Sequence, residues 1–276
     1  MPGREISPDE ELRRRIMDFI MAAGQTLLEN GAEVFRVEQT MEIMARSFHL
    51  REFHVYVLTN GIFASAGTAE ISEVRNVPTR TTHLGRVAAV NALSREIAAG
   101  EMTLDEAESR LVLARRIPFP KDHVQLLSGM CGAFCFALLF GGTLRSALAA
   151  ALAGFLASGY LLLCEQHELP GGFRKISCAA LITLVCILGC DLLHTSASHA
   201  IIGSLMILTP GIAFTMGIRD FVHGDYLSGT IRMIDALLIA ASIAIGTGLV
   251  LSLYTFVTGQ HLSDASGRFH TRSHQT

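Results

Sequence analysis

Residues 208–239 read LTPGIAFTMGIRDFVHGDYLSGTIRMIDALLI, and this stretch decides how the chain is interpreted. It begins in an apolar segment, contains the pair Pro210-Gly211, becomes charged, and then returns to apolar sequence. Proline lacks an N–H and displaces the carbonyl one turn earlier, so we expect an interrupted helix here. In a bilayer the freed backbone groups need partners in protein, water or a ligand. Transporters use such breaks to form substrate sites, and a simple proline kink is the alternative.

Charged residues follow the break and add a second signal. Ionisable side chains at the ends of membrane helices are costly and often mark ion or substrate paths. A partly desolvated Asp has a raised pKa, which suits proton exchange. The predicted proton-coupling residues are Asp220, Asp225, Asp235 and, near the end of another apolar segment, Asp191. The predicted substrate-binding residues are Thr209, Pro210, Gly211, Thr215, Arg219 and Arg232.

Composition divides the chain into two parts. Half of the 276 residues are hydrophobic, 17% are charged, and the mean hydropathy is +0.41. Charge is concentrated before Lys121, and the sequence after Val124 is mostly Leu, Ala, Ile, Gly and Phe. We therefore predict a cytoplasmic α+β domain over residues 1–121, a transmembrane domain over 122–258 and a polar tail over 259–276.

The apolar part contains five segments of about the 20 residues that a helix needs to cross a bilayer. They are Val124–Gly142, Ser146–Cys164, Ile176–Leu193, Ala197–Ile218 and Ile231–Val257. Basic residues are biased towards the loops on the side of the N-terminal domain, which predicts that this domain is cytoplasmic and the C-terminus outside. The expected fold is an α-helical protein of the cell membrane, with five transmembrane helices preceded by a small α+β domain.

The N-terminal part shows helix and hairpin signals. Two capping boxes, Ser7–Glu10 and Thr103–Glu106, predict helix starts. Asn60-Gly61 between β-forming residues predicts a two-residue hairpin, because both residues tolerate positive φ, and EISEVRNV predicts a third strand. A polar group that would suit a binding site consists of Glu33, Arg36, Glu38, Asn60, Arg75 and Arg80.

Several function classes receive no support from the sequence. No dense basic stripe is present, so we expect no nucleic-acid partner. The six cysteines lie in the apolar part and are interpreted as small packing residues, with no metal and no cofactor expected. A membrane-anchored enzyme is an alternative, but no nucleophile–base pair or phosphate loop is visible. A ligand sensor is a third possibility, although a sensor would not need five spans.

Several separated motifs resemble those of the threonine/serine exporter family. The segment 208–249 resembles the family signature, with its Pro-Gly, Arg-Asp, Gly-Asp and downstream Arg. The segments LLENGAEVFRVEQTM, TNGIFAS and RVAAVNALSR resemble the family's cytoplasmic domain. The resemblance runs from about Met17 to Val250. In one position this chain departs from the family, because Gly217 replaces the usual Asn two residues before the Arg-Asp.

The resemblance implies proton-driven efflux of small amino acids or related carboxylates, and some similar members belong to a two-gene succinate exporter. Full-length members have ten spans, whereas five are predicted here. The resemblance therefore implies that this chain is the half that carries the cytoplasmic domain and that a second small membrane subunit of the same family is its partner. A homo-oligomeric carrier is the alternative.

Overall fold

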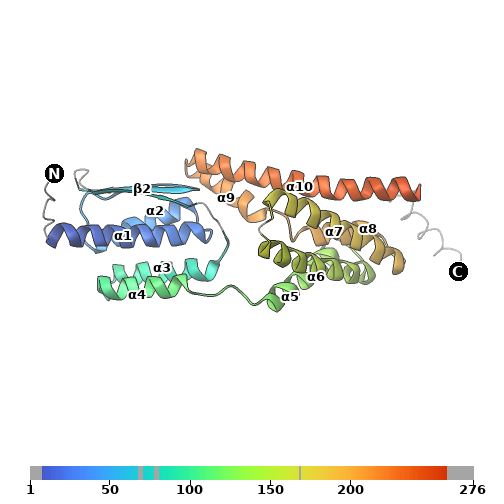
Figure 1. Ribbon diagram of the computed structural model, residues 1–276, viewed down its shortest axis with the longest axis horizontal. Helices are drawn as coiled ribbons and strands as arrows, with labels where there is room; N and C mark the ends of the chain where they lie inside the picture. Colours follow the sequence, from blue (N-terminus) through green and yellow to red (C-terminus); the bar gives the residue numbers. More distant parts are fainter. Residues whose placement is uncertain (1–7, 68–70, 78–80, 168, 260–276) are drawn as a thin grey trace. The chain divides into compact units, whose positions relative to one another are not determined.

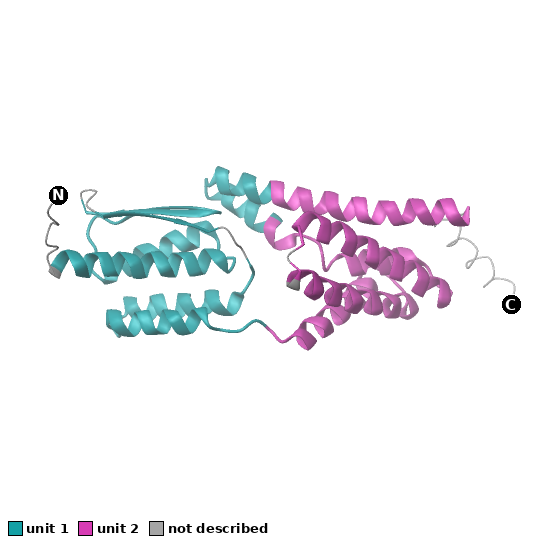
Figure 2. Cartoon of the chain, in the orientation of Figure 1, with its two compact units in different colours: residues 1–119, 214–233 teal, residues 120–213, 234–276 magenta. Residues whose placement is uncertain are grey.

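The computed structural model describes residues 8–67, 71–77, 81–167 and 169–259. The chain forms two compact units, which Figure 2 distinguishes by colour. Unit 1 combines Met1–Phe119 with Phe214–Met233, and unit 2 combines Pro120–Ala213 with Ile234–Thr276. The helices α9 (Gly211–Val222) and α10 (Tyr226–Thr258) each contribute residues to both units.

The N-terminal segment of unit 1 is built from three layers. Its elements are α1 (Pro8–Glu29), α2 (Val34–Ser47), β1 (His54–Leu58), β2 (Gly61–Ala66), β3 (Ile71–Asn76), α3 (Leu84–Ala98) and α4 (Leu104–Arg115). The strands form an antiparallel sheet in the order β1-β2-β3. The sheet packs on α1 and α2, and α3 and α4 cover their other side (Figure 1). The predicted third strand is confirmed.

Periodic apolar residues form the core of this segment. Ile20 and Leu27 on α1, Val37 and Met41 on α2, and Val90 on α3 are all almost fully buried. Burial of each such side chain contributes about 1.5–3 kcal/mol to folding. The spacing of apolar residues therefore accounts for how these helices pack.

The predicted hairpin is present, but its predicted turn is wrong. Leu58 pairs with Gly61, so the two loop residues are Thr59 and Asn60. Neither Asn60 nor Gly61 has a positive φ. The reason is that Gly61 belongs to β2, where it also pairs with Asn76 of β3.

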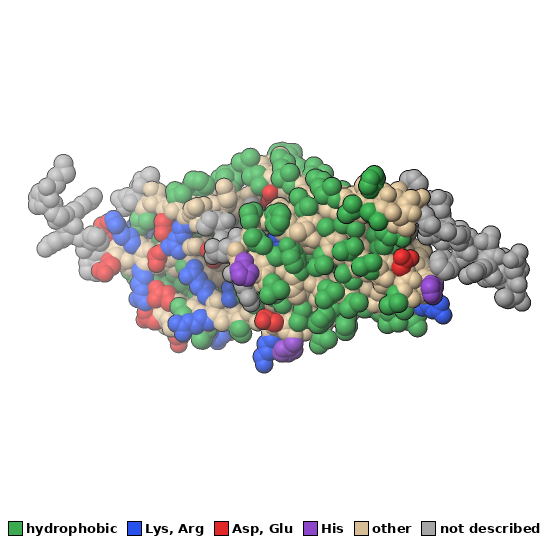
Figure 3. Space-filling view, turned by 45° about the vertical axis from the view of Figure 1, so that its right-hand side comes forward, with side chains coloured by type: hydrophobic (Ala, Val, Ile, Leu, Met, Phe, Trp, Pro, Cys, Tyr) green, Lys and Arg blue, Asp and Glu red, His purple; other side chains and the backbone are tan. Residues whose placement is uncertain are grey.

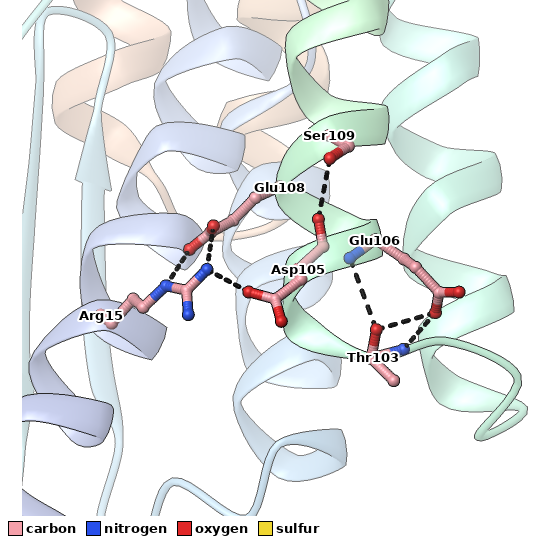
Figure 4. A network of polar contacts seen from close by, with 6 residues as sticks. All are labelled: Arg15, Thr103, Asp105, Glu106, Glu108 and Ser109. Carbon is pink, nitrogen blue, oxygen red and sulfur yellow. Dashed lines mark hydrogen bonds and ion pairs between the residues drawn. The ribbon is translucent and has the colours of Figure 1, made fainter. Parts of the chain in front are cut away.

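A polar network connects α1 to α4 (Figure 4). The Thr103 hydroxyl accepts a hydrogen bond from the Glu106 N–H, and the Glu106 carboxylate accepts one from the Thr103 N–H, so this capping box is confirmed. Arg15 forms ion pairs with Asp105 and Glu108 on α4. Because these side chains are exposed, each pair contributes at most about 1 kcal/mol. In the other predicted capping box, Ser7 lies outside the described residues.

Unit 2 contains the long apolar helices. They are α5 (Asp122–Leu139), α6 (Leu144–Gln166) and α7 (Gly171–Leu192), followed by the short α8 (Ala197–Leu205) and joined by most of α10. Among the described residues, four helices are long and apolar enough to cross a membrane, namely α5, α6, α7 and α10. The predicted segment Ala197–Ile218 is divided between α8 and α9, each much shorter than a span, so the count of five spans is not confirmed.

Small residues bring the helices of unit 2 into close contact. A Cβ atom at Gly154 on α6 would lie 2.4 Å from the Gly129 carbonyl oxygen on α5, and one at Gly246 on α10 would lie 2.2 Å from the Ile176 oxygen on α7. Cys178 is buried in the same core. Figure 3 shows a mainly hydrophobic surface over unit 2, whereas charged side chains gather over the N-terminal helices. The small residues in these spans therefore serve helix packing.

Candidate functional site around helices α9 and α10

The chain is interrupted at Pro210, as the sequence predicts. Helix α8 ends at Leu205, residues 206–208 form a turn, and α9 begins at Gly211. The Gly211 N–H donates to the Thr209 oxygen at 2.9 Å, and the Thr209 hydroxyl donates to the Leu205 oxygen at 3.2 Å. The break therefore uses the Thr209 hydroxyl to satisfy a carbonyl at the end of α8.

Glycines allow α9 and α10 to meet at a tight corner. Gly224 has a φ of +89°, and its N–H donates to the Phe221 oxygen at 3.1 Å, which ends α9. Farther from the corner, a Cβ atom at Gly217 would lie 3.3 Å from the Gly229 oxygen on α10. The two backbones approach each other there because neither glycine has a side chain.

This close approach places a buried ion pair between the two helices. The Arg232 Nε lies 3.0 Å from the Asp220 Oδ2, and the Asp220 side chain is only 3% exposed. Burial raises the pKa of Asp220, the Arg232 cation opposes that rise, and the nearby Asp225 adds to it. Two charges removed from water depend strongly on each other, so loss of either partner leaves the other uncompensated.

Within unit 1, the same corner contacts the turn that precedes α2. The Arg219 Nη1 donates to the Glu33 Oε1 at 2.7 Å, and the Arg232 Nη2 donates to the Ala32 oxygen at 3.4 Å. The rings of His223 and Phe35 stack with their centroids 4.8 Å apart. Residues about 190 positions apart in sequence therefore form one site.

A third carboxyl group lies near this site. The Glu38 Oε1 accepts a hydrogen bond from the Val57 N–H of β1 at 2.8 Å. Burial raises the pKa of Glu38, the hydrogen bond lowers it, and the charge of Asp225 raises it again. The charge of Asp225, in the turn between α9 and α10, thus acts on the carboxyl groups of both Glu38 and Asp220.

The other candidate residues are more dispersed. Thr215 is exposed on α9, Asp235 is half-buried on α10, and Asp191 is exposed near the end of α7. In the N-terminal polar group, Asn60 is exposed in the hairpin loop, and Arg75 forms ion pairs with Asp18 and Glu73.

The structure therefore does not gather this polar group into one cluster. Glu33 and Arg36 line one cavity, Glu38 binds β1, and Arg80 lies outside the described residues. In the part of the chain that the structure describes, no three His, Cys, Asp or Glu side chains are grouped so that they could hold a metal ion.

Comparison with known proteins places the chain in a family. A family model described as "Putative threonine/serine exporter" matches residues 18–254. The chain belongs to the threonine/serine exporter family. A relative described as "Probable threonine/serine exporter", from Mycobacterium tuberculosis (strain ATCC 25618 / H37Rv), is 24% identical over 243 residues. The match covers 86% of this chain and 46% of the relative, so the chain spans about half of the relative's length. No solved structure matches the chain.

Family membership and the apolar helices together give the chain a membrane location. The contacts of the α9–α10 corner with Ala32, Glu33 and Phe35 were not predicted. Periodicity within one helix gives no information about contacts between residues so far apart in sequence. The sequence feature that could have indicated close packing of α9 on α10 is the pair of glycines Gly217 and Gly229, which lets the two helices approach each other.

The buried ion pair generates a pH-dependent prediction. Arg232→Gln leaves the Asp220 carboxylate buried without its cation, and we expect a loss of about 3–5 kcal/mol in unfolding free energy at pH 7. The raised pKa means that the folded state binds a proton more readily than the unfolded state. Stability of the variant should therefore recover as the pH falls from 7 towards the ordinary Asp pKa of about 4.

Unfolding in detergent at several pH values measures this effect. Arg219→Gln is the matched control, because Arg219 is half-exposed and its pair with Glu33 should contribute at most about 1 kcal/mol. Equal destabilisation by the two substitutions, with no recovery of stability at low pH, would contradict the conclusion that Asp220 and Arg232 form a buried, mutually dependent ion pair.

Proposed function

We propose that this chain is a subunit of a proton-coupled membrane exporter. Its substrate is a small amino acid, threonine or serine, or a related small carboxylate such as a short dicarboxylate. The observation that carries the proposal is the buried Asp220–Arg232 pair beside an interrupted helix, in a chain of the threonine/serine exporter family. Family membership supports the export of a small amino acid.

The chemistry of the α9–α10 corner supports proton coupling. Burial raises the pKa of Asp220, which brings proton release closer to neutral pH. Arg232 favours the charged form, so any anion that competes for its guanidinium would favour protonation of Asp220. Substrate binding and protonation of Asp220 would then be coupled through one arginine. Asp225, Asp235 and Asp191 are further candidates for proton transfer.

The backbone at Pro210-Gly211 supports a substrate site. The half-helix α9 begins at Gly211, and the N-terminal end of a half-helix attracts a carboxylate. Thr209 and Thr215 supply hydroxyl groups near this end. Arg219 and Arg232 supply positive charge at the other end of α9. These residues are the proposed substrate contacts.

The contact between Arg219 and Glu33 supports a broken fourth crossing, which brings the number of crossings to five. Because that ion pair joins α9 to the N-terminal segment, the α9–α10 corner lies on the same side of the membrane as that segment. An even number of crossings must then separate residues 122 and 219. Three long helices, α5, α6 and α7, lie between them, so α8 and α9 together would supply the fourth crossing and α10 the fifth.

The bias of basic residues supports a cytoplasmic N-terminal domain and a C-terminus outside the cell membrane. Five crossings form an odd, asymmetric bundle, whereas many transporters move two repeats about a shared site. We propose that a second small membrane subunit of the same family completes the path. A second copy of this chain is the alternative. A membrane-anchored enzyme is disfavoured because the family is one of exporters.

Topology gives the first prediction from this proposal. Cysteines introduced at Gly100 and Gly259 should be labelled from opposite sides of the membrane, because five crossings separate them. A membrane-impermeant maleimide applied to intact cells should label position 259 and should label position 100 only after lysis. Labelling of both positions from one side would show that α8 and α9 do not cross.

Efflux measurements test the export function itself. Cells that express the chain together with an adjacent small membrane protein should export labelled serine, threonine or succinate against a gradient. Replacing the coupling carboxylate with Asn should abolish proton-driven efflux and leave downhill exchange. We expect Asp220→Asn to have this effect, and Asp225, Asp235 and Asp191 are tested in the same way.

Asp122→Asn is the matched control, since Asp122 is exposed at the start of α5. Retention of wild-type pH dependence by all four Asn variants would show that these carboxylates do not carry the proton. Absence of efflux with every candidate substrate and partner would contradict the export function.

A further inference from the structure

A cavity in unit 1 lies beside the α9–α10 corner and has no role in the proposed transport path. Its volume is about 360 Å³, within the range of sites that hold small ligands. It is lined by residues of α1, the α1–α2 turn, α2 and α3, together with Met216 of α9. All of these residues belong to unit 1.

Two arginines give the cavity its charge. Arg36 on α2 and Arg95 on α3 both line it, and neither guanidinium forms an ion pair or hydrogen bond with another described residue. Elsewhere in this unit, Arg15 and Arg75 each pair with two carboxylates. Each of these guanidinium groups can donate two parallel hydrogen bonds to a carboxylate or phosphate.

The end of α2 adds to the attraction for an anion. Glu33, at the N-cap position, makes no side-chain hydrogen bond to the first turn of α2, and its carboxylate is paired with Arg219 instead. The positive end of the helix dipole therefore faces the lining residues without a capping acceptor. Because Arg219 neutralises Glu33, the cavity carries a net positive charge.

The remaining lining residues restrict the class of anion. Leu27, Ile43 and Val87 supply an apolar floor, whereas Gln39 and Asn91 supply amide groups. Inorganic phosphate would leave the apolar surface unused. A short aliphatic chain that carries carboxylates would fill both kinds of surface.

We propose that this cavity binds a short aliphatic dicarboxylate, with Arg36 and Arg95 holding its two acidic groups. A zwitterionic amino acid binds more weakly, because its ammonium group meets the same positive charge. The occupant also lies next to Ala32 and Glu33, which bind Arg232 and Arg219 directly. Binding in this cavity therefore affects the residues that contact the α9–α10 corner. The cavity itself is not part of the proposed transport path.

Site-specific thiol protection tests the proposal on the purified full chain. Gln39→Cys places a thiol at the cavity, and mass spectrometry of the labelled peptide distinguishes it from the six natural cysteines, which all lie beyond residue 130. Succinate at ten times its Kd should slow maleimide labelling of this thiol about tenfold. Succinamide, which is uncharged, should give no protection, and L-threonine less than succinate.

Variants of the two arginines establish where the ligand binds. In the Gln39→Cys background, Arg36→Gln or Arg95→Gln should raise Kd about tenfold or more, which reduces the protection to about twofold. Arg46→Gln is the matched control, because Arg46 lies on the same helix outside the cavity, and it should keep full protection.

Four results would overturn the proposal. They are no protection by succinate, equal protection by succinamide, equal protection by inorganic phosphate, and full protection in the Arg36→Gln/Arg95→Gln variant. Binding is measured without transport, so loss of export activity in any variant leaves this test unaffected.

Discussion

The buried ion pair between Asp220 and Arg232 is the interaction on which the rest of the proposed site depends. Two opposite charges are held 3.0 Å apart, away from water, and each is tolerated only because the other is present. The pair forms because Gly217 and Gly229 let α9 and α10 approach closely. A Cβ atom at Gly217 would lie 3.3 Å from the Gly229 oxygen, and one at Gly229 would lie 3.0 Å from the Gly217 oxygen, so a side chain at either position would force the neighbouring atoms to shift. At this corner, the close packing of the α9 and α10 backbones and the Asp220–Arg232 ion pair therefore depend on each other.

This constraint connects the α9–α10 corner to the N-terminal segment of unit 1. Arg219 and Arg232 extend from the corner to Glu33 and the Ala32 carbonyl, so movement of α9 changes contacts at the start of α2. The positive cavity beside α2 shares that turn. Packed interfaces tend to change between discrete arrangements when one side moves slightly. A ligand bound in the N-terminal segment could therefore change the contacts of the charged corner. Proton, substrate and regulator would then act on one group of side chains.

Much of the fold is predictable from local sequence. Apolar periodicity, the Thr103 capping box and the Pro210-Gly211 break specify helices and their ends, because each depends on residues within about one turn. The hairpin turn was predicted wrongly because strand pairing draws Gly61 into β2. The fourth predicted span, Ala197–Ile218, was counted as one crossing from its hydropathy, whereas in the structure it is divided between α8 and α9. The contact of Arg219 with Glu33 depends on packing across almost the whole sequence, which no local pattern encodes.

Replacement of both charges by apolar residues tests most directly whether the ion pair serves export or only stability. In the double variant Asp220→Leu/Arg232→Met, no uncompensated charge remains, and such replacements of buried pairs are often neutral or stabilising by about 1–4 kcal/mol. Unfolding temperature and proton-driven efflux are measured on the same preparation, together with the partner subunit. The account predicts a folded protein at least as stable as wild type, with no proton-driven efflux. Stable protein that still exports with wild-type pH dependence would contradict it.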